Sequence, residues 1–289
     1  MKSLIKKSLR AFNFSVTTRI NGQRFRVPVI KGTGASNLRS FEPWMADLLS
    51  RLFKLAPGSA FADVGMNIGQ TLLKVQSLNP GVHYVGFEPN PFCVFYVQEL
   101  IRKNRVQNCE IIPVGLSDES GLVNFIAESE ADTAGSIISN LRSNDDAVQR
   151  QHVPVMKFDA ISAEVAPDNL QIIKIDVEGA ELEALIGMRE FLTKQRPYVS
   201  CEVLHAHSES HRSMLEERSA HIIELLTAVG YIPFRIIKQE QQRVIGLERI
   251  EAFETEIWNP VTSPARCDYL FVPQELVDRA LEEFEEFVA

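Results

Sequence analysis

The chain has 289 residues, of which 45% are hydrophobic and 24% are charged, and its formal net charge is −8. This size and composition predict one α/β domain with additions, and the acidic balance argues against a non-specific nucleic-acid-binding protein. No apolar run is long enough to span a bilayer. The four cysteines have no paired spacing, so we expect reduced thiols without a disulfide or zinc site, and a cytoplasmic location.

The first ten residues are basic and amphipathic. Lys6, Lys7 and Arg10 interrupt the apolar core that a signal peptide needs, so secretion is not indicated. We interpret the segment as a solvated helix at the domain edge, and the alternative is a weak contact with a membrane surface.

Two further elements precede the main domain. Alternating residues around Asn21-Gly22 predict a β-hairpin with arms at Phe14–Ile20 and Gln23–Ile30. Residues 40–55 have apolar side chains at helical spacing and predict a helix. We expect an N-terminal extension (residues 1–56), a main α/β domain (57–273) and an acidic C-terminal helix (274–289).

The stretch from Phe61 to Thr71 predicts a buried strand, a glycine turn and the start of a helix, with the pattern Asp63-x-Gly65-x-Asn67-x-Gly69. Such an element brings backbone N–H groups to the carboxyl edge of a parallel sheet, where open α/β sheets bind small ligands. A dinucleotide fingerprint would need glycine in place of Asn67, and the lysine of a P-loop is absent. Asp63 would repel an anion but not a cationic amine or sulfonium. The alternative is a tight turn that binds no ligand.

A second predicted strand, residues 82–87, ends in Glu88-Pro89-Asn90-Pro91. Glu88 follows Asp63 by 25 positions, close to where nucleotide-binding α/β units place a ribose-binding carboxylate. A carboxylate there can accept hydrogen bonds from both ribose hydroxyls. The alternative is a carboxylate that complements the dipole of the next helix; the glycine turn upstream favours ligand contact.

A second acidic landmark follows a predicted central strand at residues 172–175. Asp176, Glu178 and Glu181 crowd the end of this strand, and Gly179 permits a turn into a helix. Neighbouring buried carboxylates raise the pKa of one member unless cations or donors meet them, and such clusters are frequently functional. The alternative is an acid-rich helix start.

The rest of the chain supplies further elements and one loop. Strands are predicted at residues 109–114, 122–127, 153–158, 197–204, 234–237, 243–247 and 267–273, and helices at 92–104, 219–229 and 274–288. A long surface loop near the ligand is predicted before residue 150. His205 follows the strand at 197–204 and has a near-neutral pKa suited to accepting a proton, with a surface histidine as an equally good interpretation.

Taken in order, five stretches resemble the FkbM family of S-adenosylmethionine-dependent methyltransferases and together cover about residues 58–273. They are Asp63-Val64-Gly65-Met66-Asn67-Ile68-Gly69, Phe87-Glu88-Pro89-Asn90-Pro91, Gly115-Leu116-Ser117-Asp118, Ile173-Lys174-Ile175-Asp176-Val177-Glu178-Gly179-Ala180-Glu181 and Asp268-Tyr269-Leu270-Phe271. Each stretch alone is a weak indication of the family, whereas the five stretches in this order are specific for it. Met66 departs from the alanine usual in the family, which is tolerated if its side chain points away from the ligand.

The resemblance implies a doubly wound, seven-stranded, mostly parallel α/β sheet with an antiparallel last strand. It also implies S-adenosylmethionine across the switch point of the sheet. The implied cofactor residues are Asp63, Gly65, Asn67 and Gly69 under the methionine part, Glu88 at the ribose, Leu116 and Ser117 at the adenine, and Asp176 beside the sulfonium. Asn90, two positions after Glu88, is a further implied cofactor-binding residue.

The resemblance further implies O-methylation of a sugar or related small molecule in polysaccharide or natural-product synthesis. Removal of the acceptor's proton then needs a base, and the candidates are Asp176, Glu178 and His205. A Mg²⁺ bound by Asp176 and Glu202 that lowers the acceptor's pKa is the alternative, although the sequence offers no third ligand. We expect the loop Glu128–Arg150 and the segment His205–Arg218 to select the acceptor.

Two other functions stay open. One is N-methylation of a peptide or protein, and the other is a non-catalytic scaffold that binds the cofactor. Asn67 and Gln70 disfavour a hydride-transferring dehydrogenase. The sequence gives no indication of oligomeric state.

Overall fold

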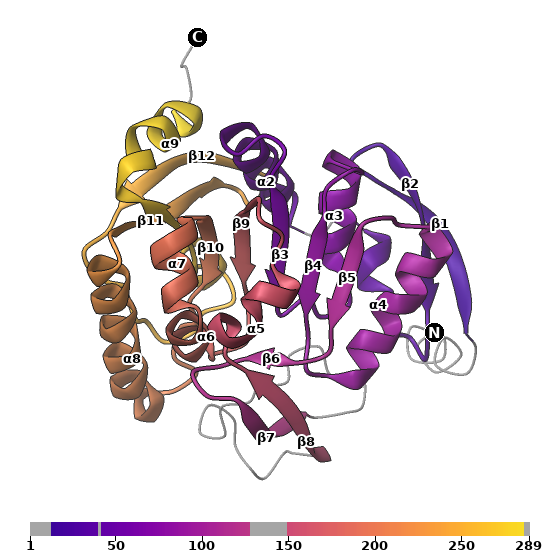
Figure 1. The fold of residues 1–289 in the computed structure, drawn as a ribbon, viewed down its shortest axis with the longest axis horizontal. Coiled ribbons are helices and arrows are strands. Elements are labelled where there is room, and N and C mark those ends of the chain that lie inside the picture. The colour runs from indigo at the N-terminus through magenta and orange to yellow at the C-terminus, as the bar shows by residue number, and fades with distance from the viewer. Residues whose placement is uncertain (1–12, 40–41, 128–148, 286–289) are drawn as a thin grey trace.

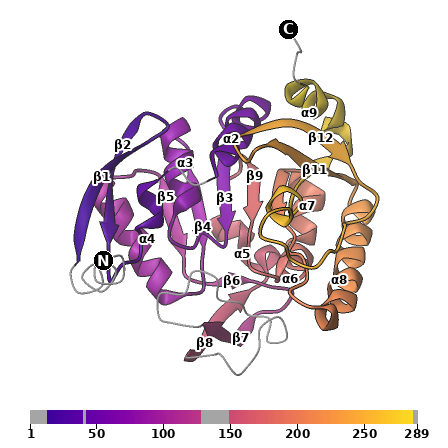
Figure 2. The same cartoon turned by 180° about the vertical axis from the view of Figure 1, so that it is seen from behind.

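The computed structural model describes residues 13–39, 42–127 and 149–285, and Figures 1 and 2 show its layers from opposite sides. Over these residues the main sheet has eight strands in the order β12-β11-β13-β10-β9-β3-β4-β5. The strands are β3 (Ala60–Val64), β4 (Tyr84–Phe87), β5 (Cys109–Ile112), β9 (Leu170–Ile175), β10 (Tyr198–Glu202), β11 (Tyr231–Gln239), β12 (Arg243–Arg249) and β13 (Asp268–Pro273).

The predicted doubly wound sheet is confirmed, with one additional strand. β5, β4, β3, β9 and β10 run parallel, and β13 is inserted antiparallel between β10 and β11. Seven strands thus have the expected arrangement. The eighth, β12, pairs antiparallel with β11 through a tight turn at Glu240 and Gln241, both of which have positive φ, and so extends that edge of the sheet.

Helices cover both faces of the sheet (Figures 1 and 2). They are α2 (Pro43–Leu55), α3 (Gln70–Leu78), α4 (Pro91–Asn104), α5 (Phe158–Val165), α6 (Glu181–Gly187), α7 (Arg189–Gln195), α8 (Glu209–Ala228) and α9 (Val277–Phe284). Successive strand residues point to opposite faces. Phe61 therefore packs in one core with α2, α3, α4 and α9, whereas Ala62 packs in a second core with α6, α7 and α8.

The predicted N-terminal hairpin is confirmed as β1 (Phe14–Ile20) and β2 (Gln23–Val29). Asn21 and Gly22 both have positive φ, as a two-residue hairpin turn requires. The hairpin packs on α4, where the Tyr96 hydroxyl donates to the Pro28 carbonyl oxygen at 2.7 Å. The expected domain limits at residues 56 and 273 stay a prediction.

A small second sheet lies below the carboxyl ends of the main strands in Figure 1. It has the order β6-β8-β7, formed by β6 (Gly115–Leu116), β7 (Gly121–Ala127) and β8 (Gln149–Met156). The sequence analysis predicted strands here but not a separate sheet. Short 3-10 helices complete the fold at Ser36–Leu38, Ser263–Ala265 and Gln274–Leu276.

Several predicted boundaries were wrong. α8 begins at Glu209 rather than residue 219, so most of the segment expected to select the acceptor is helical. Phe158 starts α5 rather than ending a strand, and the C-terminal helix is α9, after a 3-10 turn. Two predicted segments are not tested. Residues 1–12, which include the basic segment, and residues 128–148 of the predicted loop Glu128–Arg150 lie outside the described residues.

Candidate active site

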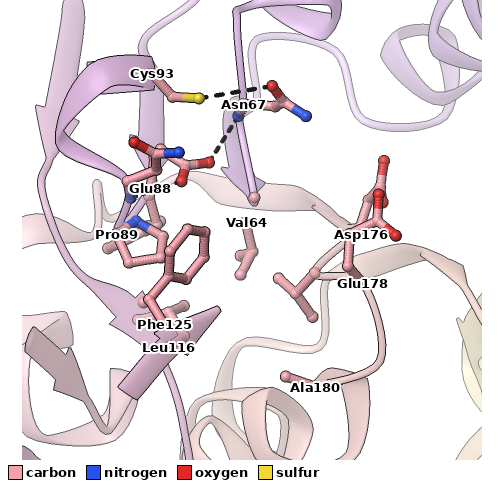
Figure 3. A pocket seen from close by; sticks show the side chains of 15 residues that line it. Val64, Asn67, Glu88, Pro89, Cys93, Leu116, Phe125, Asp176, Glu178 and Ala180 are labelled. Atoms are coloured by element: carbon pink, nitrogen blue, oxygen red, sulfur yellow. Dashed lines mark hydrogen bonds between the residues drawn. The ribbon is translucent and has the colours of Figure 1, made fainter. Parts of the chain in front are cut away.

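A pocket opens at the carboxyl ends of β3, β4 and β9, and Figure 3 shows the side chains around it. It contains about 600 Å³ of space free of protein atoms, part of it open to solvent, which is in the range of small-molecule sites. Its described lining is Val64, Gly65, Asn67, Phe87, Glu88, Pro89, Asn90, Cys93, Gly115, Leu116, Phe125, Asp176, Val177, Glu178 and Ala180. The charged members of this described lining are all carboxylates.

The turn after β3 forms one side of the pocket. The chain reverses through Gly65, Asn67 and Gly69, which have φ values of 80°, 51° and 75°. A Cβ atom on Gly65 would lie 1.9 Å from the backbone oxygen of Asp176. Position 65 therefore requires glycine for two reasons: its φ is positive, and a side chain would separate this turn from the turn after β9.

Glu88, at the end of β4, closes the next side. One carboxyl oxygen accepts from the Asn67 N–H at 2.9 Å (Figure 3), and the other accepts from the Asn90 N–H at 2.8 Å. Burial raises the pKa of Glu88 to about 7, although these two backbone donors act to lower it. Each oxygen keeps a second lone pair, so the ionised group can still accept from two neighbouring hydroxyls.

An apolar end of the pocket is formed by Pro89, Leu116 and Phe125, which lie together in Figure 3. Leu116 comes from β6 and Phe125 from β7, so the small second sheet contributes this wall. Ser117, assigned from sequence to the adenine, lies outside the lining. Its N–H donates to the Met156 carbonyl oxygen at 3.0 Å, within the small sheet.

The turn after β9 carries Asp176 and Glu178 to the opposite side of the pocket (Figure 3). Glu178 has a φ of 54° and Gly179 a φ of 103°. Arg218, from α8, donates to the Gly179 carbonyl oxygen at 2.9 Å and to both carboxyl oxygens of Glu183. The Gly179 N–H donates to Glu181 at 2.9 Å, and burial raises the pKa of Glu181 to about 7.

Asp176 is partly exposed in the pocket and forms an ion pair with a buried lysine on the side away from the pocket. Its side chain is 34% exposed, and one oxygen accepts from the Lys174 ammonium at 2.9 Å. Burial acts to raise the pKa of Asp176, but Lys174 and a hydrogen bond from Glu202 bring it below the usual range. The group is therefore a carboxylate at neutral pH.

Asp63 and Gly69 belong to the first turn but do not line the pocket. Asp63 is fully buried behind it and accepts from the Tyr84 hydroxyl at 2.5 Å, with the Lys174 ammonium 3.7 Å from its other oxygen. Gly69 precedes α3 and faces Leu100 and the rest of α4. Any contribution of Asp63 to ligand binding thus passes through its neighbours.

His205 is likewise outside the pocket lining, and only 2% of it is exposed. Its Nδ1 accepts from the Glu256 N–H at 3.3 Å, which places the proton of the neutral ring on Nε2. Burial lowers the pKa of His205. Neither ring nitrogen is then available to accept a proton, so this geometry favours Asp176 and Glu178 over His205 as the base.

Several residues of the site were missed by the sequence analysis. Cys93 and Phe125 gave no sequence signal, because both stand in ordinary apolar runs. Lys174 was within the stretch used to identify the family, but its spacing of two from Asp176 was not interpreted as an ion pair. Met66 is 2% exposed and is absent from the lining, so its side chain points away from the pocket, as its tolerance requires.

No three His, Cys, Asp or Glu side chains in the described part of the chain are arranged to hold a metal ion. The reaction proposed for this site uses no magnesium ion. Among the same residues, no helix has the length and apolar character needed to cross a membrane.

The parallel sheet with its carboxyl-edge pocket has the architecture of a Rossmann-like, S-adenosylmethionine-dependent methyltransferase. Comparison with known families agrees, because the model described as "Methyltransferase FkbM domain" matches residues 63–233, more than half of the chain. The chain belongs to the FkbM methyltransferase family.

Known proteins similar to the chain are also methyltransferases. The 2-O-methyltransferase NoeI of Sinorhizobium fredii (strain NBRC 101917 / NGR234) is 26% identical over 151 residues, which are 48% of this chain and 61% of NoeI. The chain thus spans less than two thirds of that relative's length.

Solved structures show weaker likeness. A methyltransferase FkbM from Methylobacillus flagellatus KT has 16% identity and a TM-score of 0.44, with 74% of this chain and 43% of that chain covered. A putative caffeoyl-CoA O-methyltransferase from Staphylococcus aureus has 12% identity and a TM-score of 0.46, with 79% and 82% covered. Since both TM-scores are below 0.5, the family assignment rests on the sequence match.

Proposed function

We propose that the enzyme transfers the methyl group of S-adenosylmethionine to a hydroxyl group of a carbohydrate or related small molecule. The observation that carries this proposal is the position of the Asp176 carboxylate, partly exposed in the pocket and directly beside the Gly65 turn. The similarity to NoeI, a 2-O-methyltransferase, supports oxygen as the atom methylated.

The charge of the lining supports a cationic cofactor. Glu88, Asp176 and Glu178 contribute carboxylates to the described lining, and no Lys, Arg or His belongs to it. A sulfonium ligand is attracted by such a site, whereas a dinucleotide pyrophosphate is repelled. In the proposed pose, Glu88 accepts from the ribose hydroxyls, the wall of Leu116 and Phe125 covers the adenine, and the methionine part lies on the Gly65 turn.

The reaction is an in-line displacement. The acceptor oxygen attacks the methyl carbon, the carbon–sulfur bond breaks with its electron pair going to sulfur, and the acceptor proton passes to a base. We assign the base to Asp176, with Glu178 as the second candidate. Alignment of the two reactants in one pocket can contribute about 7–11 kcal/mol to catalysis, and the proton transfer adds a factor of about 10²–10⁴.

A cytoplasmic location remains a prediction, made from the four cysteines, which are all free thiols in the structure.

Calorimetric titration with S-adenosylmethionine tests the cofactor pose. We expect binding by the wild type, and binding at least 10-fold weaker in Glu88→Ala. The matched control is Glu110→Ala, a carboxylate on the neighbouring β5 that pairs with His83 at the surface, and its affinity should equal that of the wild type. Equal binding by both variants and the wild type would contradict the assigned pose.

The acceptor is then sought by mass spectrometry, with neutral mono- and oligosaccharides in one set and peptides in another. Transfer to a sugar hydroxyl is the expected result. Transfer to peptide nitrogen alone would make the enzyme an N-methyltransferase, and cofactor binding without transfer to any acceptor would favour a scaffold.

A further inference from the structure

A row of ionisable side chains crosses the sheet immediately behind the pocket. In the strand register, Asp63 of β3 is paired with Lys174 of β9, and Glu202 of β10 is paired with Asp268 of β13. Asp176 follows Lys174 by two positions, which places it on the same face. The row therefore runs from the cofactor turn, through the proposed base, to the antiparallel strand.

Lys174 joins the first two acids. Its side chain is 9% exposed, and its ammonium lies 2.9 Å from an Asp176 oxygen and 3.7 Å from an Asp63 oxygen. Burial acts to lower the pKa of Lys174, but the two carboxylates raise it above its ordinary value, so the side chain is a cation. The buried Lys174 cation thus links Asp63, behind the Gly65 turn, with Asp176 in the pocket.

Glu202 lies beside Asp176 on the neighbouring strand, because the register pairs Cys201 with Ile175 and each acid is the next residue. The two carboxyl groups interact directly, and two carboxyl groups can hydrogen-bond only if one of them is protonated. The Lys174 ammonium at 2.9 Å favours the charged form of Asp176, so we assign the proton to Glu202, whose pKa is raised by burial and by the charge of Asp176. Its Oε1 also lies 3.4 Å from the Cys267 sulfur, which approaches Asp268 at 3.5 Å.

The far end of the row is closed by Lys238. Its ammonium donates to Asp268 at 2.5 Å and lies 4.4 Å from the centre of the Trp44 ring. Asp268 is therefore already paired, and Glu202 has Asp176 as its partner across the sheet. The other charged groups that act on Asp176 and Glu202 are Lys74 of α3 and Glu178 of the pocket turn.

We propose that Lys174 and Glu202 are positioning residues for methyl transfer, which fix the Asp176 carboxylate from two sides and leave its remaining lone pairs to the acceptor hydroxyl. This inference rests on the proposed function of Asp176. During the reaction the acceptor's O–H bond breaks and its proton goes to Asp176, while Glu202 keeps its own proton and Lys174 keeps its charge. Neither positioning residue contacts the acceptor.

Two substitutions of Glu202 test whether Asp176 needs a hydrogen-bond donor from this position. Glu202→Gln keeps a hydrogen-bond donor for Asp176, so we expect kcat within about 3-fold of the wild type. Glu202→Ala removes the donor, and we expect kcat to fall at least 10-fold while the Kd for S-adenosylmethionine stays within 3-fold. Wild-type kcat in Glu202→Ala, or an equal loss in both variants, would overturn the proposal.

Lys174 is tested by the pH profile of kcat. Lys174→Met removes the cation that holds the pKa of Asp176 down, so the acidic limb of the profile should move to higher pH. Lys174→Arg should restore the wild-type limb at least in part. An unmoved limb in Lys174→Met contradicts the role, and if that variant does not fold, the Glu202 pair decides.

Infrared difference spectroscopy gives a readout that needs no acceptor. At pH 7 the difference spectrum between the wild type and Glu202→Gln should contain a protonated-carboxyl band, because Glu202 is the acid removed. The bands of the other buried acids with raised pKa values, which are Asp63, Glu88, Glu181 and Asp268, are common to both proteins and cancel. Absence of the band from this difference spectrum overturns the inference, whereas failure of the wild type to methylate any hydroxyl, with the band present, overturns only the proposed function.

Discussion

The two turns that face each other across the pocket share a feature of their backbone and are held by different means. Both contain a non-glycine residue with positive φ and a glycine with positive φ: Asn67 with Gly65 and Gly69 after β3, and Glu178 with Gly179 after β9. The first turn is held by backbone contacts and by Glu88 from the next strand. The second is held by Arg218, which reaches it from α8, 39 positions along the chain.

Each turn also directs one backbone N–H to a buried carboxylate. Asn67 donates to Glu88 and Gly179 donates to Glu181, both at 2.9 Å, and burial raises the pKa of both acids to about 7. Glu88 lines the pocket, whereas Glu181 does not. The same hydrogen bond between a turn N–H and a buried carboxylate therefore lies in the pocket lining at one turn and outside it at the other.

This difference teaches where the sequence carries its information. A turn that depends on glycines can be identified locally, because the spacing of the glycines records its shape. At the second turn, Gly179 likewise marks the turn in the sequence, but the contact with Arg218 from a distant helix leaves no local pattern. Substitutions in each turn, and then a change of pH, test how the two turns are held, from the largest expected effect to the smallest.

Gly65→Ala should have the largest effect. The new Cβ atom would lie 1.9 Å from the Asp176 carbonyl oxygen at a φ of 80°, so the two turns must separate. We expect a loss of about 2–4 kcal/mol in the free energy of unfolding and cofactor binding at least 100-fold weaker, measured by urea denaturation and calorimetry.

The control for this change is Gly81→Ala, whose Cβ atom would meet its nearest neighbour, the Asn79 side chain, at an ordinary 3.9 Å. It should behave like the wild type. A Gly65→Ala protein with wild-type affinity would show that contact between the two turns does not matter for the cofactor.

Arg218→Ala should have an intermediate effect. The substitution removes a charge-assisted hydrogen bond to Gly179 and the paired bonds to Glu183, of which the charged donor is only 18% exposed. We expect a loss of about 1–3 kcal/mol in stability and an approximately 10-fold decrease in kcat, because Asp176 and Glu178 lose their fixed positions.

The matched control is Arg212→Ala, on the same helix, whose partners Glu209 and Glu216 are both exposed. Exposed pairs contribute about 0–1 kcal/mol, so this variant should change little. If both variants behaved alike, Arg218 would be an ordinary surface arginine and the second turn would need no distant anchor.

The smallest effect is expected from pH. Because the pKa of Glu88 is raised to about 7, the carboxylate that we propose as the ribose acceptor is increasingly protonated as the pH falls. The Kd for S-adenosylmethionine should rise by up to about 10-fold between pH 8 and pH 6. Glu88→Gln should bind weakly with little pH dependence, whereas Glu181→Gln should keep the wild-type profile; a flat wild-type profile would contradict the pairing of Glu88 with the ribose.

The sequence predicted the fold better than the site. Strands such as β3 and β9 were predicted because continuous apolar residues mark a buried parallel strand, and the hairpin because Asn21-Gly22 sets its turn. The predicted helix began too late because the first ten residues of α8 contain only two apolar side chains, Met214 and Leu215, which are too few to show the helical period.

In the site, the residues found from sequence are those whose role depends on local chain geometry, such as Gly65, Asn67 and Glu88. Phe125 and Glu202 acquire their positions only when separate strands are brought together, and Glu202 was considered from sequence only as a magnesium ligand. The spacing of two between Lys174 and Asp176 indicates a shared face, but the proximity of Lys174 to Asp63 depends on the pairing of β9 with β3. His205 was chosen for the pKa of its residue type, and the structure buries it away from the pocket lining.

The position of Met66 has a consequence for how this protein can diverge. Its sulfur occupies the space beside Gly86 of β4, where a Cβ atom would lie only 2.6 Å away. The two residues therefore share one volume, and a smaller side chain at position 66 leaves room for a larger one at position 86. In evolutionary terms, we expect the two positions to vary together: alanine at the first removes the tightest contact at the second, where the Tyr84 ring at 3.0 Å is then the nearest neighbour of a new Cβ atom.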